Sequence, residues 1–288
     1  TDQRLLLVEP QEFIIDGQDV KEPIGMSGIR LEAKIHIVTG AQSAAENIIK
    51  CVRRCGLEVE QLMLHPLASS QAVLTEDERE LGVVLVDIGA GTTDVAIFTG
   101  GAIRHTAVIP IAGDLITSDI AMALRTPTKD AEDIKVESGC AKQLLADHDT
   151  QVEVPGLGDR EPRMLSKQAL AGVIEPRVEE IYSLVHQVIR ESGFEELLSS
   201  GIVITGGTSV MPGMIELGED IFLKPVRRGI PTYRGALSDM VAQPRAATVM
   251  GLLEEARMAR LRGHKVAQKA GTVHTALGRV KDWFVGNF

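Results

Sequence analysis

The chain has 288 residues, of which 44% are apolar, so it can bury a sizeable core and is long enough for about two domains. No apolar run approaches the roughly 18 residues of a membrane span, and the first residues lack the pattern of a secretory leader, so we expect neither. The net charge is −10, yet residues 257–288 hold seven basic residues and one acid. An acidic body with a basic tail argues against a nucleic-acid binder and indicates a tail that meets an anionic surface.

The three cysteines form no Cys-x-x-Cys pair. Cys51 and Cys55 lie one helical turn apart in an apolar stripe, and Cys140 stands alone. We therefore expect buried free thiols in a reducing compartment rather than a metal site or a disulfide.

The first part of the chain alternates strand and helix patterns. The chain begins with Thr1 inside an expected strand, so we expect that residues precede it in the complete protein. Apolar periodicity predicts a strand over 31–39, a helix over 41–56, a strand over 57–64 and a short helix over 66–74.

The stretch VLVDIGAGTTDVAIF predicts a strand, a glycine turn and a second strand, and residues 102–111 complete a hairpin. Glycines in such a turn let backbone N–H groups point at phosphate oxygens, threonines add hydroxyl donors, and a carboxylate beside them can hold hydrated Mg²⁺. An ordinary tight hairpin capped by the carboxylate explains the spacing equally well. The residues concerned are Asp87, Gly89, Gly91, Thr92 and Thr93.

A second glycine turn, ITGGTSVMPG, follows an apolar strand over 201–207 and precedes a helix. Gly206 and Gly207 can pass beneath a flat nucleotide, with Thr208 as a donor. Two such turns, each at the end of a strand, predict an α/β protein whose ligand lies at the carboxyl ends of the strands. Between the two turns we expect helices over 113–124, 126–142 and 166–193, with Thr128 as an N-cap and with Pro176 kinking or dividing the third helix. Residues 152–165, rich in glycine and proline, are expected to form a small hairpin or a surface excursion, and a helix over 212–222 follows the second turn.

This order of elements resembles the actin-like ATPases, and within them the FtsA family of bacterial cell-division proteins. The resemblance covers essentially the whole chain and rests on PQEFIIDG, PIGMSGIRLEAKIHIVTG, LASSQAVLTEDERELGVVLVDIGAGTTDVAIFTGGAIRHT and GIVITGGTSVMPGM. It implies an α/β, actin-like ATPase fold: a ribonuclease H-like lobe with a mixed sheet and flanking helices, a small α+β subdomain and a C-terminal amphipathic helix.

The resemblance also divides the chain. Residues 1–80 would hold the remaining part of the family-specific small subdomain and a connecting helix, and residues 81–253 the second actin-like lobe with the phosphate-2 and adenosine motifs. Residues 254–272, which are polar, small and basic, are expected to form a linker before an amphipathic membrane-targeting helix over 273–288.

The resemblance implies that ATP and Mg²⁺ are the cofactors. The residues of the first glycine turn match the loop that is called the second phosphate loop in this family, and Asp87 of this turn would hold the metal. Gly206, Gly207 and Thr208 match the adenosine motif. Glu132 and Lys135, one helical turn apart, resemble the pair that contacts the adenosine. The alternative for this pair is an exposed salt bridge worth a few tenths of a kcal/mol.

Two departures from the family pattern stand out. The first phosphate loop, an Asp-x-Gly-Thr turn, has no counterpart before Val83, so we expect this chain to bind ATP more weakly than the complete protein. His65 stands where several relatives have an acidic residue that orients water. A packing or surface histidine is the alternative, and we expect weak or no ATPase activity.

The last residues predict an amphipathic helix. Basic residues near its apolar face attract anionic lipid by about 1 kcal/mol each, whereas Gly278 and Gly286 each weaken the isolated helix by about 1 kcal/mol, so we expect it to fold on contact. The alternative is a terminal helix docked on its own domain. The residues assigned to the membrane are Leu277, Val280, Trp283, Phe284 and Phe288, with Arg279 and Lys281.

The resemblance implies an adaptor in cell division. Such a protein binds ATP, self-assembles, anchors FtsZ filaments through the C-terminal peptide of FtsZ to the cytoplasmic face of the inner membrane at the septum, and recruits later divisome proteins. We assign the FtsZ-contacting surface to the helix around Arg177 and Glu180. The alternatives are a pilus-assembly scaffold of the same fold, which predicts no amphipathic anchor, and an actin-like small-molecule kinase, which needs a catalytic carboxylate in a substrate pocket.

Overall fold

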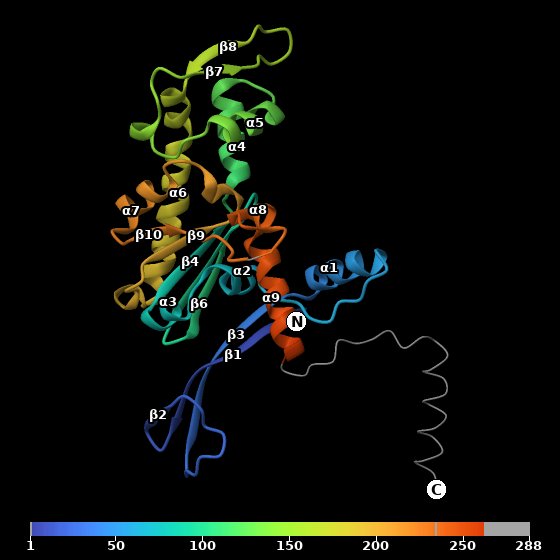
Figure 1. The fold of residues 1–288 in the computed structure, drawn as a ribbon, viewed down its shortest axis with the longest axis vertical. Coiled ribbons are helices and arrows are strands. Elements are labelled where there is room, and N and C mark those ends of the chain that lie inside the picture. Colours follow the sequence, from blue (N-terminus) through green and yellow to red (C-terminus); the bar gives the residue numbers. More distant parts are fainter. Residues whose placement is uncertain (1, 234, 262–288) are drawn as a thin grey trace.

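The computed structural model describes residues 2–233 and 235–261, and its elements spread along one long axis (Figure 1). A five-stranded sheet lies at the centre, a three-stranded sheet at one end and a two-stranded hairpin at the other. The hairpin consists of β7 (Gln151–Val154) and β8 (Arg163–Ser166), as the sequence predicted.

The central sheet has the order β10-β9-β4-β5-β6. β4, β5 and β6 are antiparallel neighbours, whereas β9 runs parallel to β4 and β10 parallel to β9. Every residue of β4, β5 and β9 is buried, because helices cover both faces of the sheet, and this explains the continuous apolar runs in the sequence. The strands are β4 (Val83–Ile88), β5 (Thr93–Thr99), β6 (Ala102–Ile109), β9 (Ile202–Thr205) and β10 (Val226–Arg228).

Two apolar clusters fill the spaces on either side of this sheet. Successive residues of a strand point to opposite faces, so Val84 and Val86 enter one cluster and Val83 and Leu85 the other. The first cluster packs against α4 (Gly113–Leu124), α6 (Lys167–Ser192) and α7 (Met214–Phe222). The second packs against α2 (His65–Val73) and α9 (Ala247–Leu261). The remaining helices are α3 (Glu76–Leu81), α5 (Thr128–Ser138), α8 (Ser238–Val241) and the 3₁₀ turns η1 (Gln143–Leu145), η2 (Glu195–Leu197), η3 (Gly207–Val210) and η4 (Pro244–Ala246).

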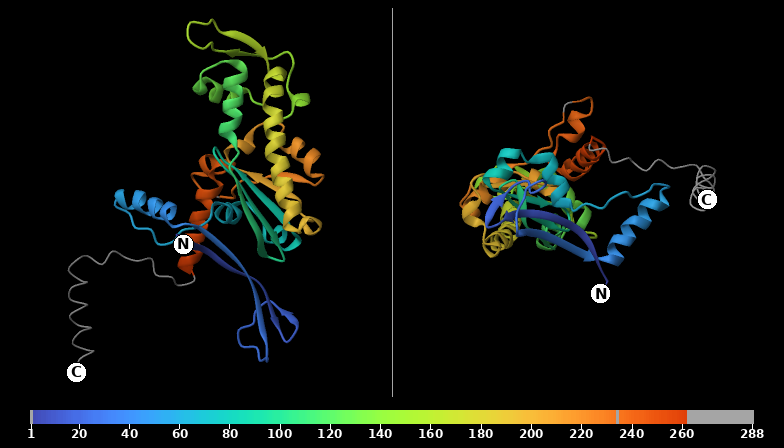
Figure 2. Two further views of the ribbon diagram at one scale, coloured as in Figure 1. Left: turned by 180° about the vertical axis from the view of Figure 1, so that it is seen from behind. Right: turned by 90° about the horizontal axis from the view of Figure 1, so that it is seen from below.

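The N-terminal unit, residues 2–56, projects from the edge of the central sheet (Figure 2). Its antiparallel sheet has the order β2-β1-β3 and is followed by α1. The unit contacts the rest of the chain chiefly along β6. Its elements are β1 (Gln3–Ile15), β2 (Gln18–Val20), β3 (Leu31–Ala41) and α1 (Gln42–Arg54).

The expected α/β fold class is confirmed, and several local predictions are wrong. Residues 57–64 form no strand, because no other strand in the part of the chain that the structure describes pairs with them. Residues 254–261 continue α9 instead of beginning a linker. The helix starts at Ala247, where it is buried against the rest of the chain, and it runs without a break to Leu261. Thr128 is the first residue of α5, with Pro127 before it as the N-cap, and α6 runs through Pro176 undivided.

The prediction of buried thiols holds for Cys140 and is wrong for Cys51 and Cys55, which are exposed. Cys51 lies on α1 and Cys55 is the C-cap residue of that helix. The apolar stripe of α1 is only partly covered: Ala45 is buried, whereas Ile48 is 57% exposed. A helical apolar stripe therefore did not guarantee burial here.

The predicted amphipathic helix over 273–288 and the linker residues 262–272 lie outside the described residues. Within the described ranges, no helix combines the length and the apolar character needed to cross a bilayer.

Candidate functional site

The two glycine turns meet at one edge of the central sheet. β4 and β9 are parallel neighbours in which Asp87 pairs with Thr205, so the turns that follow both strands lie side by side. Gly206 has φ +87°, and a Cβ there would lie 2.4 Å from the Ile88 carbonyl oxygen and 2.5 Å from Asp87 Oδ1. Only glycine fits this approach. Thr208 Oγ1 then donates to the Gly89 carbonyl oxygen at 2.8 Å and joins the two turns.

Asp87 is buried at the end of β4 and held by two hydroxyl groups. Ser69 Oγ of α2 donates to Asp87 Oδ2 at 2.5 Å, and Thr248 Oγ1 of α9 lies 3.4 Å from the same oxygen. Burial raises the pKa of Asp87, although the hydrogen bonds from Ser69 and Thr248 and the nearby His65 oppose that rise. Side chains from two helices, α2 and α9, thus fix one carboxylate at the end of β4.

Asp94, which the sequence reasoning missed, is a second buried carboxylate of this corner. It lies directly opposite Asp87 in the β4–β5 register, and opposed residues share a face of the sheet. Burial raises the pKa of Asp94, the charge of Asp87 adds to the rise, and His65, whose Nδ1 is 3.9 Å from Asp94 Oδ2, opposes it. Counting residues outward from the glycine turn of the predicted hairpin would have paired Asp94 with Asp87 and so identified it from the sequence.

Two facing buried carboxylates with raised pKa values suit a divalent cation, because a cation favours their charged form. Mg²⁺ is held in proteins by one or two carboxylates, with waters and phosphate oxygens as its other ligands. No group of three or more His, Cys, Asp or Glu side chains that could hold a metal occurs within the described ranges, so protein atoms alone would not complete a shell. The residues present fit a magnesium ion that arrives with a phosphate ligand.

The glycine turn at 89–92 closes onto the start of α4. The Gly113 and Asp114 N–H groups donate to the carbonyl oxygens of Gly89 and Ala90 at 3.1 and 2.8 Å. Gly91 lies at the open side, with nothing within 4 Å of a Cβ built on it. Thr92 Oγ1 is 3.4 Å from Asp94, while Thr93 is fully buried and donates to the Ile111 carbonyl oxygen at 2.7 Å. In this conformation the Thr93 hydroxyl donates its proton to the backbone of the loop between β6 and α4, so it is not available as a donor to a phosphate.

Glu132 and Lys135 of α5 belong to the same corner. Lys135 is buried, and its Nζ donates to the Gly113 carbonyl oxygen at 3.1 Å and to Thr117 Oγ1 at 2.8 Å, and pairs with Glu132 at 2.6 Å. Partial burial raises the pKa of Glu132, but hydrogen bonds from Lys135 and Thr117 outweigh it and hold the pKa below its usual value. Lys135 is buried whereas the Glu132 side chain is 46% exposed, so the pair is half-buried and its cation is tied to the Gly113 backbone, unlike a salt bridge that is exposed at both ends. A cavity of about 350 Å³ beside it is lined by Asp114, Thr117, Thr128, Lys129, Glu132 and Asp133.

Gly113 connects the pair to the glycine turns. A Cβ at this position would lie 2.5 Å from Thr208 Oγ1, 3.1 Å from the Gly89 carbonyl oxygen and 3.6 Å from Lys135 Nζ. Gly207, by contrast, opens η3 with space around it. Sequence reasoning missed Gly113, Ser69 and Thr248, because each lies far along the chain from the turn it contacts.

Arg177 and Glu180 lie apart from this corner, on α6. Arg177 makes a two-point contact with Asp119 of α4, at 2.6 and 3.0 Å, and also pairs with Glu180. These bonds hold the pKa of Arg177 above its usual value. The membrane residues assigned from the sequence, Leu277 to Phe288, lie outside the described residues.

A mixed sheet with paired glycine turns at one edge defines the class of the protein: it has the actin-like ATPase fold. Solved structures agree. The chain superposes on MreB5 of Spiroplasma citri bound to ADP with a TM-score of 0.61 at 20% identity, over 77% of this chain and 67% of that one. It also superposes on the PilM–PilN type IV pilus biogenesis complex with a TM-score of 0.64 at 17% identity, over 92% and 68%. At these identities the likeness shows the fold alone.

Sequence comparison is more specific. The family described as "Cell division protein FtsA" matches residues 84–251, and "SHS2 domain inserted in FTSA" matches residues 1–39. The chain is 54% identical to the cell division protein FtsA of Pseudomonas aeruginosa and 46% identical to that of Escherichia coli K12. These matches cover all of this chain and 70% and 71% of the two relatives. The chain belongs to the FtsA family of cell-division proteins.

Proposed function

We propose that the corner between the two glycine turns binds ATP together with Mg²⁺. The observation that carries this proposal is the convergence, from five separate elements, of two opposed buried carboxylates, two glycine turns and the Glu132–Lys135 pair. The MreB5 neighbour was solved with ADP, which is compatible with a nucleotide at this place in the fold.

Each group has a part in this proposal. Asp87 and Asp94 hold the hydrated Mg²⁺, which neutralises phosphate charge when bound. The Gly89 N–H donates within the turn to the Thr92 carbonyl oxygen, so the phosphates face the part of the turn around Gly91, and the turn at 206–208 passes beneath the nucleotide. Glu132 and Lys135 contact the adenosine. The His65 side chain is 71% exposed beside Asp94, a weak position for orienting water, which supports slow hydrolysis or none.

The nucleotide site is tested by the affinity for ATP in the presence and absence of Mg²⁺. Asp94→Asn keeps the size of the side chain but removes its charge, so we expect roughly tenfold weaker binding, or ~1.4 kcal/mol, only when Mg²⁺ is present. Asp220→Asn, in an ion pair with Lys142 outside the corner, is the matched control. Equal affinities for Asp94→Asn and the unaltered chain in Mg²⁺ would count against the site.

We further infer that the chain is part of an adaptor that self-assembles, tethers FtsZ to the cytoplasmic face of the inner membrane at the septum and recruits later division proteins. Membership of the FtsA family supports this inference. In the proposed arrangement, residues 1–80 provide assembly contacts and residues 81–253 the nucleotide lobe. Residues 273–288 lie on anionic lipid.

Membrane attachment is tested by co-sedimentation with anionic vesicles, with and without residues 274–288. We expect binding to be lost with the segment and weakened by salt, because Arg279 and Lys281 act through charge. Undiminished vesicle binding by the shortened chain would reject the anchor.

The FtsZ contact is tested with a peptide of the last residues of FtsZ. Arg177→Ala should weaken capture of the peptide if α6 carries the contact, while Arg190→Ala, nearer the end of the same helix, serves as the control. Because Asp119 would lose its partner, the melting temperature of Arg177→Ala must be measured alongside. Capture that is equal for both variants would place the contact elsewhere.

A further inference from the structure

Two hydroxyl groups and one carboxylate oxygen form a closed set of hydrogen bonds beside the proposed metal site. Ser69 Oγ donates to Asp87 Oδ2 at 2.5 Å. Ser69 Oγ and Thr248 Oγ1 are 3.0 Å apart, and Thr248 Oγ1 lies 3.4 Å from the same Oδ2. A hydroxyl group has one proton to donate. Because the Ser69 proton is directed to Asp87, Thr248 is the donor toward Ser69, and the bonds run in one direction, from α9 through α2 to the carboxylate.

These bonds engage one oxygen of Asp87 and leave the other on the side of the glycine turns. A Cβ on Gly206 would lie 2.5 Å from Asp87 Oδ1, so Oδ1 is the oxygen next to the turn that follows β9. Rotation of the carboxylate would exchange its two oxygens, and the hydrogen bonds to Oδ2 oppose that rotation. Hydrogen bonds of this kind orient metal-binding carboxylates in proteins, and their loss lowers metal affinity.

The position of Thr248 depends on how α9 is seated on α2. Thr248 lies in the first turn of α9, and Gly251, three residues later, is on the same side of the helix. A Cβ on Gly251 would lie 1.6 Å from the carbonyl oxygen of Ala68, the residue before Ser69, so the closest approach of the helices and the hydroxyl contact are adjacent. Ala68 and Ser69 are fully buried. Any shift of α9 away from α2 would therefore lengthen the bond from Thr248 to Ser69.

We propose that Ser69 and Thr248 are positioning residues that aim Asp87 at the Mg²⁺ of bound ATP, and that through Thr248 the seating of α9 and the binding of Mg·ATP strengthen each other. The inference rests on the proposed nucleotide site. Such coupling is reciprocal, so seating of α9 strengthens Mg·ATP binding by the same factor as Mg·ATP stabilises the seated helix. Because α9 leads directly into residues 262–288, an event that moves this helix changes the affinity of the metal site.

The positioning role is tested by the affinity for ATP in Mg²⁺ and in EDTA. Thr248→Val keeps the shape of the side chain and removes its hydroxyl group, so we expect roughly fivefold weaker binding in Mg²⁺ and unchanged binding in EDTA. Thr248→Ser retains the hydroxyl group and should restore the affinity. Thr150→Val, which removes a hydroxyl bond to the exposed Asp147 outside the corner, is the matched control and should change neither value.

Ser69→Ala is a second variant with a larger expected effect. It removes the bond that Asp87 accepts directly, so we expect binding in Mg²⁺ to weaken about tenfold. An unchanged affinity in EDTA shows that the site is still folded. Affinities in Mg²⁺ that are equal for Ser69→Ala, Thr248→Val and the unaltered chain would overturn the positioning role.

The coupling is tested by amide hydrogen exchange in α9. Mg·ATP should slow this exchange about fivefold in the unaltered chain and in Thr248→Ser, but not in Thr248→Val, and ATP in EDTA should have no effect. Binding that depends on Mg²⁺ but leaves exchange in α9 unchanged would overturn the coupling while the nucleotide site stands. An unaltered chain that binds no ATP at all would reject the site itself and the inference with it.

Discussion

Two parts of the molecule, the central lobe (residues 65–261) and the N-terminal unit (residues 2–56), are each stabilised by different forces. In the lobe, side chains on both faces of the central sheet, such as Leu85 and Ile97, and on the helices that cover it, such as Ile174 of α6, are fully buried. Among the described residues before His65, Ala45 is the one buried apolar residue, and Ile35 and Ile37 of β3 are about half exposed. Apolar burial defines the lobe and contributes little to the unit.

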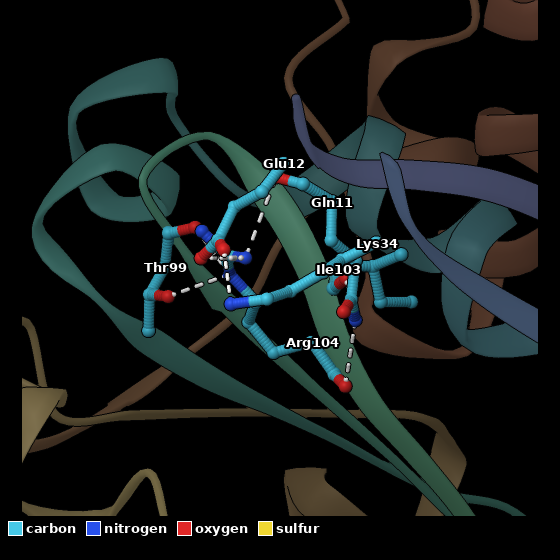
Figure 3. A network of polar contacts seen from close by, with 6 residues as sticks. All are labelled: Gln11, Glu12, Lys34, Thr99, Ile103 and Arg104. Atoms are coloured by element: carbon cyan, nitrogen blue, oxygen red, sulfur yellow. Dashed lines mark hydrogen bonds and ion pairs between the residues drawn. The ribbon is translucent and has the colours of Figure 1, made fainter. Parts of the chain in front are cut away.

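The unit is attached to the lobe by polar contacts at β6 (Figure 3). Gln11 Nε2 donates to the carbonyl oxygens of Ile103 and Arg104 at 2.9 and 3.0 Å, and Arg104 pairs with Glu12 at 3.1 Å. Glu12 also pairs with Lys34, and Arg104 Nε donates to Thr99 Oγ1 at 3.0 Å. Hydrogen bonds are directional, so they fix how the unit is oriented although they add little to its stability.

The largest effect is expected where α9 crosses α2 inside the lobe. Gly251→Ala would place a Cβ 1.6 Å from the Ala68 carbonyl oxygen, so the two helices must separate. We expect the free energy of unfolding to fall by about 3 kcal/mol or more in chemical denaturation. Gly91→Ala, where the added Cβ meets nothing within 4 Å, is the control; similar losses for both would mean that the crossing is not tight.

An intermediate effect is expected at the junction. Arg104→Ala removes the junction contact with Glu12, worth about 1 kcal/mol, while the Gln11 bonds to the backbone of β6 remain, so it should loosen the attachment of the unit without unfolding the lobe. Amide hydrogen exchange should accelerate in β1 and β3 while β4 keeps its protection. Lys34→Ala, which removes the exposed partner of Glu12, should change little. Equal acceleration in β4 would show that unit and lobe unfold together.

The smallest effect is expected from pH at the same junction. Burial lowers the pKa of His36 and of His105, and the charge of His105 lowers that of His36 further. Below about pH 6.5 the unfolded chain therefore binds more protons at these two histidines than the folded chain does. The contribution of the two neutral imidazoles to the free energy of unfolding is present above that pH and is lost as the pH falls through it. We expect the protection factors of the β3 amides, which are corrected for the intrinsic pH dependence of exchange, to fall slightly between about pH 7 and pH 5, and His36→Gln with His105→Gln to flatten this dependence. An unchanged slope in the double variant would assign it to other groups.

Much of the lobe could be predicted from the sequence, because its signals are local. The β4–β5–β6 hairpins, α4, α6 and β9 follow from apolar runs, glycine turns and helical periodicity. The strand predicted over 57–64 was wrong. A strand forms only when another strand pairs with it, and the sequence of one segment does not say which other segment will pair. The exposure of Cys51 and Cys55 was missed for the same reason: periodicity gives a face but not what covers it.

The sequence by itself determined that Asp87 and the glycines around it could form a phosphate turn, and that Gly206 and Gly207 could form another. Only the tertiary structure decided that the turns meet, that Asp94 stands beside Asp87, and that Ser69 and Thr248 hold the carboxylate. The physical reason is the range of the signal. A turn needs a few adjacent residues, whereas a binding corner needs the order and register of strands, which depend on how distant segments share one buried core.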